Sequence, residues 1–180
     1  RLMELIKGFH LRRATVVVGN SSYTLGLVAD DYRLERCRTK VIHNGVRVEA
    51  QGNVYPKDVN NCFTVLMLAR FVAQKRIPML VDAFAGFVAR GGVGRLVLAG
   101  NGVEFDHVAK HVESRGIASY VDMPGFVHDV ESLYRQASVC ALASHGEGFG
   151  LVGAEALLHG VPFIALADGG RNSEILSLTQ

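Results

Sequence analysis

The feature that most constrains the fold of this chain is a series of largely unbroken apolar runs that alternate with helical stretches. The runs lack the regular apolar and polar alternation that is typical of a strand with one solvated face. They occupy residues 14–19, 62–69, 95–100, 120–125, 138–144 and 161–167. Continuous runs are expected of strands that are buried on both faces. The pattern therefore predicts an α/β fold, a doubly wound, Rossmann-like parallel sheet flanked by helices.

The stretches between the runs carry helix signals. Residues 77–90 place Leu80 and Phe84 on one face of a helix, with Pro78 in its first turn. Ser21 or Ser22 is expected to cap a helix that follows the first run, and Asp129 to cap one near residue 130. Another helix is expected to start near residue 172.

A polar stretch divides the chain. Residues 51–61 contain Gly, Pro and Asn without an apolar period, which predicts a linker. Residues 1–50 are interpreted as the last βαβ piece of a neighbouring α/β domain. Residues 62–180 are interpreted as a second domain that is incomplete at its C-terminus.

Composition excludes several classes of function. The net charge of the 180 residues is only +2, so no nucleic-acid partner is expected. Positive charge is concentrated in residues 1–50, with nine Lys and Arg against five Asp and Glu. Such a segment either contacts an anionic surface or is a solvated face. No apolar run is long enough to span a bilayer, and no signal peptide is evident. Three cysteines without a CxxC pair favour a reducing compartment, and Cys140 is expected in the core.

Cationic residues follow the second apolar run, where a parallel sheet binds its ligands. The carboxyl ends of the strands meet at one edge of such a sheet. Arg70 comes directly after the run, and Lys75 follows five residues later. Both could neutralise phosphates, although a surface ion pair at Arg70 and a solvated helix start at Lys75 are the alternatives.

The stretch from Ser144 to Leu157, SHGEGFGLVGAEAL, follows another run and adds glycines and two acids. Gly148 and Gly150 let the backbone approach a ligand, and the next helix offers unpaired N–H groups to an anion. Glu147 is expected to accept hydrogen bonds from ligand hydroxyls, unless it only stabilises the helix N-terminus. Glu155 either reaches the ligand or pairs with another protein group.

Two other kinds of site are poorly supported. Gly146, Gly148 and Leu151, with Asp168 further on, match a dinucleotide fingerprint only in part. The seven histidines are scattered and nothing has metal-ligand spacing, so no metal site is expected.

Several of these segments, in order, resemble the donor-binding half of retaining GT-B glycosyltransferases of family 4, also called glycosyl transferases group 1. The resemblance covers nearly the whole chain. The most specific element is Glu147-x7-Glu155 with Gly-Phe-Gly-Leu inside it, and the Arg-x4-Lys pair adds to it. The matching segments are NGV (44–46), ARFVAQK (69–75), LVLAGNG (96–102), VDMPGFV (121–127), EGFGLVGAEAL (147–157), GVPFIA (160–165) and SEI (173–175).

The resemblance implies a role for each site residue. Arg70 and Lys75 would bind the nucleotide diphosphate, and Glu147 would hold hydroxyls of the donor sugar. Glu155 would bind the ribose. The backbone of the turn would meet sugar and phosphate, and the loop before residue 128 would meet the base. The turn comprises Gly148, Phe149, Gly150 and Leu151, and the loop contributes Phe126 and Val127.

The sequence departs from the family pattern at a few positions. Ala69 replaces the usual glycine before the arginine, Arg76 the glycine after the lysine, and Ala143 a frequent proline. None of these changes removes a charge that contacts the ligand, although Arg76 could crowd the phosphate loop.

The activity implied by the resemblance is transfer of a sugar from a UDP-, GDP- or ADP-sugar, with retention, to a glycan, lipid-linked or small-molecule acceptor. No metal or other cofactor is expected. Because most of an acceptor-binding N-terminal domain is missing, the chain alone is expected to be inactive. A role in cell-envelope polysaccharide biosynthesis in the cytoplasm is expected, and the basic first segment is compatible with peripheral contact at the inner membrane face. The alternatives are a noncatalytic nucleotide-binding or scaffold module and, more distantly, an NAD-dependent oxidoreductase.

Overall fold

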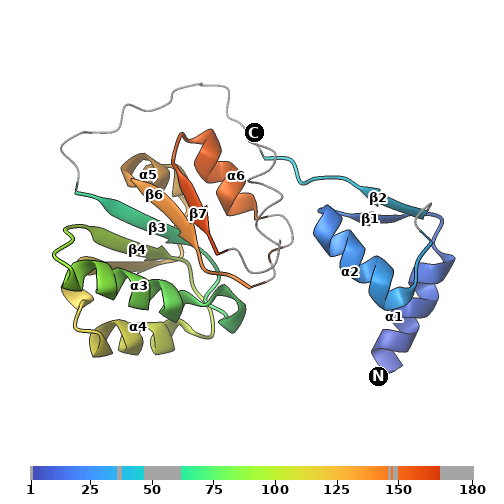
Figure 1. Ribbon diagram of the computed structural model, residues 1–180, viewed down its shortest axis with the longest axis horizontal. Coiled ribbons are helices and arrows are strands. Elements are labelled where there is room, and N and C mark those ends of the chain that lie inside the picture. The colour runs from blue at the N-terminus through green and yellow to red at the C-terminus, as the bar shows by residue number, and fades with distance from the viewer. Residues whose placement is uncertain (1, 36–37, 47–61, 146, 148–149, 167–180) are drawn as a thin grey trace. The chain divides into compact units, whose positions relative to one another are not determined.

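The computed structural model describes residues 2–35, 38–46, 62–145, 147 and 150–166 (Figure 1). The chain divides into two compact units. The first contains Arg1–Val46, Glu147–Leu151 and Ala167–Gln180, and the second contains Arg47–Gly146 and Val152–Leu166. The predicted linker and the helix expected near residue 172 lie outside the described residues. The domain boundaries inferred from the sequence stay a prediction.

The first unit contains a βαβ arrangement, as the sequence predicts. Strands β1 (Val17–Gly19) and β2 (Thr39–Val41) are parallel and are joined through helix α2 (Ser22–Tyr32). The side chain of Ser21 caps α2 by accepting a hydrogen bond from the backbone N–H of Thr24 at 3.0 Å.

A helix that the sequence analysis missed precedes this arrangement. Helix α1 spans Leu2–Arg13. Its apolar residues include Met3, Leu5, Ile6 and Phe9, and all four are exposed. They form no single buried face, so no helical period marks this segment in the sequence.

The second unit is built on a five-stranded parallel sheet. The strand order is β5-β4-β3-β6-β7, so the chain reverses its direction of travel across the sheet between β3 and β6. This confirms the predicted doubly wound topology, in which ligands bind beyond the carboxyl ends of the strands near the reversal. The strands are β3 (Thr64–Leu68), β4 (Arg95–Ala99), β5 (Val121–Gly125), β6 (Val139–Leu142) and β7 (Phe163–Ala165).

Helices cover both faces of this sheet (Figure 1). Alternate residues of β3 point to opposite sides: Val65 and Met67 pack with α3 (Ile77–Ala89) and α4 (Phe105–Ser114), and Leu66 packs with α5 (Val130–Gln136) and α6 (Leu151–Leu158). Both core clusters are apolar, which explains why the strands are continuous apolar runs in the sequence.

Local signals in the sequence mark the helix starts correctly. Asp129 caps α5 by accepting from the N–H of Ser132, and Pro78 lies in the first turn of α3. Short 3₁₀ turns, η2 (Ala73–Lys75) and η3 (Ala118–Tyr120), precede α3 and β5. Within the described part of the chain, no helix has both the length and the apolar character that crossing a bilayer requires.

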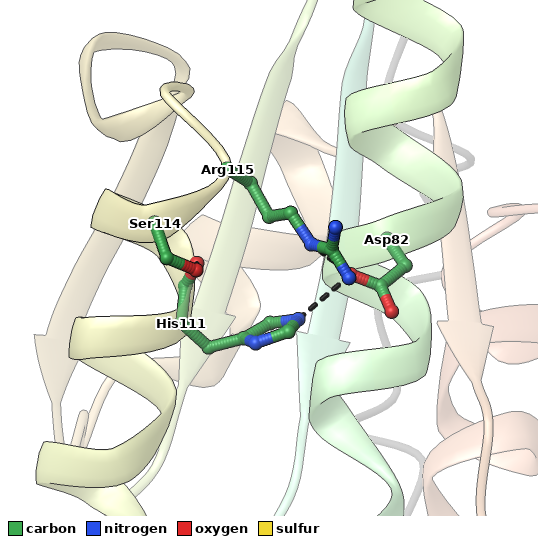
Figure 2. Close-up of polar contacts among 4 residues, drawn as sticks. All are labelled: Asp82, His111, Ser114 and Arg115. Carbon is green, nitrogen blue, oxygen red and sulfur yellow. Dashed lines mark hydrogen bonds and ion pairs between the residues drawn. The ribbon is translucent and has the colours of Figure 1, made fainter.

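An ionic cluster on the surface joins α3 to α4 (Figure 2). One carboxylate oxygen of Asp82, Oδ1, contacts both His111 Nε2 and Arg115 Nε at 2.7 Å. Loss of surrounding water is the largest single influence on the pKa of Asp82 and raises it. The hydrogen bonds from His111 and Arg115, with their charges, outweigh this influence and lower the pKa below its usual value.

Replacing Asp82 by asparagine is expected to destabilise the fold by about 1 kcal/mol at pH 7, because exposed ion pairs contribute little. A carboxylate with a lowered pKa stabilises the fold above its unfolded pKa of about 3.8, and the effect is lost as the pH falls through the folded value. The free energies of unfolding of wild type and Asp82→Asn, measured with urea, should therefore differ at pH 7 and converge below pH 3.8. A Glu113→Gln variant, which changes an exposed carboxylate of α4, is the control and should show no such difference.

Candidate functional site

A pocket of about 340 Å³ lies at the carboxyl edge of the second unit's sheet. The ends of β3 and β4, the segment after β5 and the first two turns of α6 form its walls. This is the position that the doubly wound topology predicts for a ligand. The lining residues are Leu68, Ala69, Arg70, Ala99, Gly100, Asn101, Phe126, Val127, Val130, Val152 and Glu155.

Arg70 stands at the pocket where β3 ends. The next residue, Phe71, is buried and packs against Phe105 with ring centroids 5.1 Å apart. The backbone N–H of Phe71 donates to the carbonyl of Asn101 at 2.9 Å. The packing and the hydrogen bond of Phe71 thus fix the backbone beside Arg70. The side chain of Arg70 is exposed and forms no ion pair with any residue that the structure describes. A guanidinium in this position is available to bind an anion.

The loops after β3 and β4 touch each other at the pocket wall. A Cβ atom on Gly100 would lie 1.8 Å from the carbonyl oxygen of Ala69, and Gly100 has a φ of +135°. Its N–H donates to the carbonyl of Gly125 at 2.8 Å, which links β4 to β5. Only glycine fits this position, because it must combine close backbone contact with a positive φ.

Glu155 enters the pocket from α6 and has a partner within the protein. Its Oε2 accepts a hydrogen bond from the phenol of Tyr134 on α5 at 2.9 Å. Glu155 thus has the protein partner that one alternative expects, and its half-buried carboxylate also lines the pocket, while its contact with a ligand stays a prediction.

Phe126 and Val127 add an apolar wall. Phe126 is 70% exposed, and its ring meets His128 edge to face at 4.9 Å. With Val130 and Val152 nearby, the described lining combines an apolar surface with the cation Arg70 and the carboxylate Glu155. Such a set suits a ligand that carries a flat ring, hydroxyl groups and an anionic group.

The structure brings Arg70, Phe126, Val127 and Glu155 together around this pocket. Lys75 lies in η2 and is not part of the lining. Glu147, Gly150 and Leu151 are described, but they group with the first unit. Gly148 and Phe149 lie outside the described residues. The roles of all these residues stay predictions.

The backbone at Arg76 shows why the family usually has glycine at this position. It has a φ of +48° and a ψ of +39°, the left-handed conformation, directly before α3. This conformation favours glycine, which is the residue that the family usually has there.

The other groups that the sequence raised are the cysteines and possible metal ligands. Cys140 is fully buried in the core, as expected, and burial raises the pKa of its thiol to about 12. Cys62 and Cys140 are not in a disulfide. Among the described residues, no three His, Cys, Asp or Glu side chains are placed to hold a metal ion.

Tyr134 is the main site residue that the sequence analysis missed. It lies 21 positions before Glu155, on a different helix. Periodicity places Tyr134 only in the core, and no spacing rule links two helices on one face of a sheet. The contact becomes visible only in three dimensions.

A family model supports the family suggested by the motifs. The model of "Glycosyl transferases group 1" matches residues 52–178. This range contains every residue that lines the pocket.

Known proteins of similar sequence include named glycosyltransferases. Mannosylfructose-phosphate synthase of Agrobacterium fabrum is 27% identical over 177 residues, covering 88% of this chain and 39% of the relative. D-inositol 3-phosphate glycosyltransferase of Salinispora tropica is 31% identical over 145 residues, covering 79% and 28%. The chain thus spans well under half the length of these relatives.

A solved structure shows the same architecture. Anabaena HepE, solved in complex with UDP and glucose, is 26% identical and superposes with a TM-score of 0.80. The match covers 98% of this chain and 50% of HepE.

Proposed function

Because the chain belongs to the glycosyl transferases group 1 family, we propose that it supplies the donor-binding part of an enzyme that transfers a sugar from a nucleotide-diphosphate sugar to an acceptor. The observation that carries the proposal is the pocket at the carboxyl edge of the sheet. It has the cation Arg70 and the carboxylate Glu155 in its lining, together with an apolar surface.

Each part of the donor has a matching group in this proposal. The guanidinium of Arg70 binds the diphosphate and stabilises the negative charge that develops as the nucleotide leaves. Glu155 accepts hydrogen bonds from the ribose hydroxyls. The base lies against the apolar wall that Phe126 and Val127 form. Lys75 and Glu147 carry the roles that the resemblance implies, a second cation for the diphosphate and an acceptor for sugar hydroxyls.

Finer features of the reaction belong to the same proposal. We expect retention at the anomeric carbon, and no divalent metal, because the cations and backbone amides supply the positive charge. The acceptor, a glycan, a lipid-linked sugar or a small molecule, would be bound by another part of the protein. The unpaired Cys62 and Cys140 agree with a cytoplasmic enzyme, with peripheral membrane contact where the acceptor is lipid-linked.

A thermal-shift screen of the full-length protein tests the proposal. At a hundred times its dissociation constant, a ligand stabilises the folded state by about 2.7 kcal/mol, which raises Tm by several degrees. UDP-glucose is the first donor to test, because HepE was solved with UDP and glucose, and GDP-mannose and ADP-glucose complete the set. We expect at least one of them to raise Tm and NAD to leave it unchanged. Stabilisation by NAD alone would favour an oxidoreductase and contradict the proposal.

Binding without transfer would indicate a noncatalytic module. An activity assay distinguishes this module from an enzyme. It measures the nucleoside diphosphate that the full-length protein releases when extracts containing candidate acceptors are added. We expect release that depends on the acceptor.

A further inference from the structure

A buried phenol of the core reaches the pocket through one carboxylate. Tyr134 is 1% exposed and is among the largest fully buried side chains of the described residues. Its ring stacks on His159 with centroids 4.8 Å apart and planes 15° apart. Its hydroxyl donates to Glu155 Oε2 at 2.9 Å and lies 3.4 Å from the carbonyl of Val152. The phenol therefore contacts α6 beside the pocket, while the pocket lining does not include Tyr134 itself.

The hydroxyl of Tyr134 remains a hydrogen-bond donor because it does not ionise near neutral pH. Burial, first, and the nearby carboxylate of Glu155 both raise the pKa of Tyr134 far above its usual value. The hydroxyl is therefore protonated at neutral pH. Its hydrogen bond to a charged acceptor is of the stronger kind.

The hydrogen bond from Tyr134 occupies one carboxylate oxygen of Glu155 and leaves the other oxygen available. Among the residues that the structure describes, Tyr134 is the one side chain that donates to Glu155, and it uses Oε2. The other oxygen, Oε1, has no protein donor in this part of the chain. A glutamate side chain has three rotatable bonds, and fixing them before a ligand arrives lowers the entropy lost on binding.

We propose that Tyr134 is a positioning residue that holds the carboxylate of Glu155 in the orientation that accepts hydrogen bonds from the vicinal hydroxyls of the donor's ribose. The inference rests on the proposed function of the pocket. It adds a residue that touches no ligand and acts through Glu155. Its contribution must disappear when the ribose lacks hydroxyls, which a general effect on folding would not do.

The test compares Tyr134→Phe with wild type in the full-length protein, using titration calorimetry. Phenylalanine keeps the ring that stacks on His159 and removes only the hydroxyl. The probes are UDP and 2′,3′-dideoxy-UDP, with the GDP and ADP pairs measured in the same way. We expect Tyr134→Phe to weaken UDP binding about tenfold and to leave binding of the dideoxy compound unchanged. Tyr120→Phe, which removes an exposed hydroxyl of η3, should change neither affinity.

A double-mutant cycle with Glu155→Gln adds a second readout. If Tyr134 acts through Glu155, the double variant should bind UDP no more weakly than Glu155→Gln alone. Additive losses would overturn the positioning role. So would wild-type affinity for UDP in Tyr134→Phe, equal losses for both probes, or a Tyr134→Phe protein that fails to fold. Absence of binding of all three nucleoside diphosphates to wild type is a different result, because it removes the proposed function itself.

Discussion

Replacing Arg70 by alanine is expected to lower kcat/KM for sugar transfer by about 10² to 10³ in the full-length enzyme. Among the described residues that line the pocket, Arg70 is the one cation, and it forms no ion pair with this part of the chain. In the proposed reaction, the leaving diphosphate gains negative charge. Loss of one well-placed donor to such a group costs about 3 to 4 kcal/mol of transition-state stabilisation.

Steady-state kinetics with the donor that the thermal-shift screen identifies provide the measurement. Arg90→Ala is the matched control, because Arg90 is an exposed arginine at the end of α3 and does not line the pocket. It should keep wild-type kinetics. The kcat/KM of Arg70→Lys should fall between those of Arg70→Ala and Arg90→Ala, since lysine keeps the charge but not the bidentate geometry. If Arg70→Ala and Arg90→Ala were equally active, Arg70 would have no role in binding the diphosphate.

Replacing Gly100 by alanine is expected to destabilise the second unit by about 4 kcal/mol and to abolish nucleotide binding. The new Cβ would lie 1.8 Å from the carbonyl oxygen of Ala69, and a φ of +135° is strained for any other residue. To relieve the contact, the backbone after β3 or after β4 must move. Both segments form walls of the pocket, so stability and binding should be lost together.

Gly116→Ala separates backbone strain from steric conflict. Gly116 also has a positive φ, +67°, but a Cβ there would meet no atom within 4 Å. Strain alone should cost about 1 kcal/mol at this position and leave the pocket intact. Urea unfolding and nucleotide titration of the two variants give the comparison. Equal stability of the two variants would show that the contact between Gly100 and Ala69 does not constrain the pocket.

Most of the second unit could be predicted from the sequence, because helices cover both faces of its central strands. That burial makes β3, β4 and β6 apolar after their first residues, and local caps such as Asp129 mark the helix starts. Helix α1 could not be predicted, because its apolar side chains are exposed and carry no helical period. Strand β2 has only three residues and ends at Val41, before the Asn-Gly pair, so it is too short to appear among the apolar runs.

Part of the candidate site was also predictable. The rule that ligands lie beyond the strand ends leads to Arg70 directly, and the specific Glu-x7-Glu motif leads to Glu155. Tyr134 could not be inferred in this way, because its role depends on how α5 and α6 pack on one face of the sheet. The strain at Arg76 was equally hidden, since the sequence shows a missing glycine but not the left-handed backbone that favours one.

The most direct test of the central claim is a crystal structure of the full-length protein with a bound nucleotide sugar. We predict the diphosphate within hydrogen-bond distance of the Arg70 guanidinium and the ribose hydroxyls at the carboxylate of Glu155. A nucleotide bound elsewhere on the protein, with the side chain of Arg70 turned away from its phosphates, would contradict the claim.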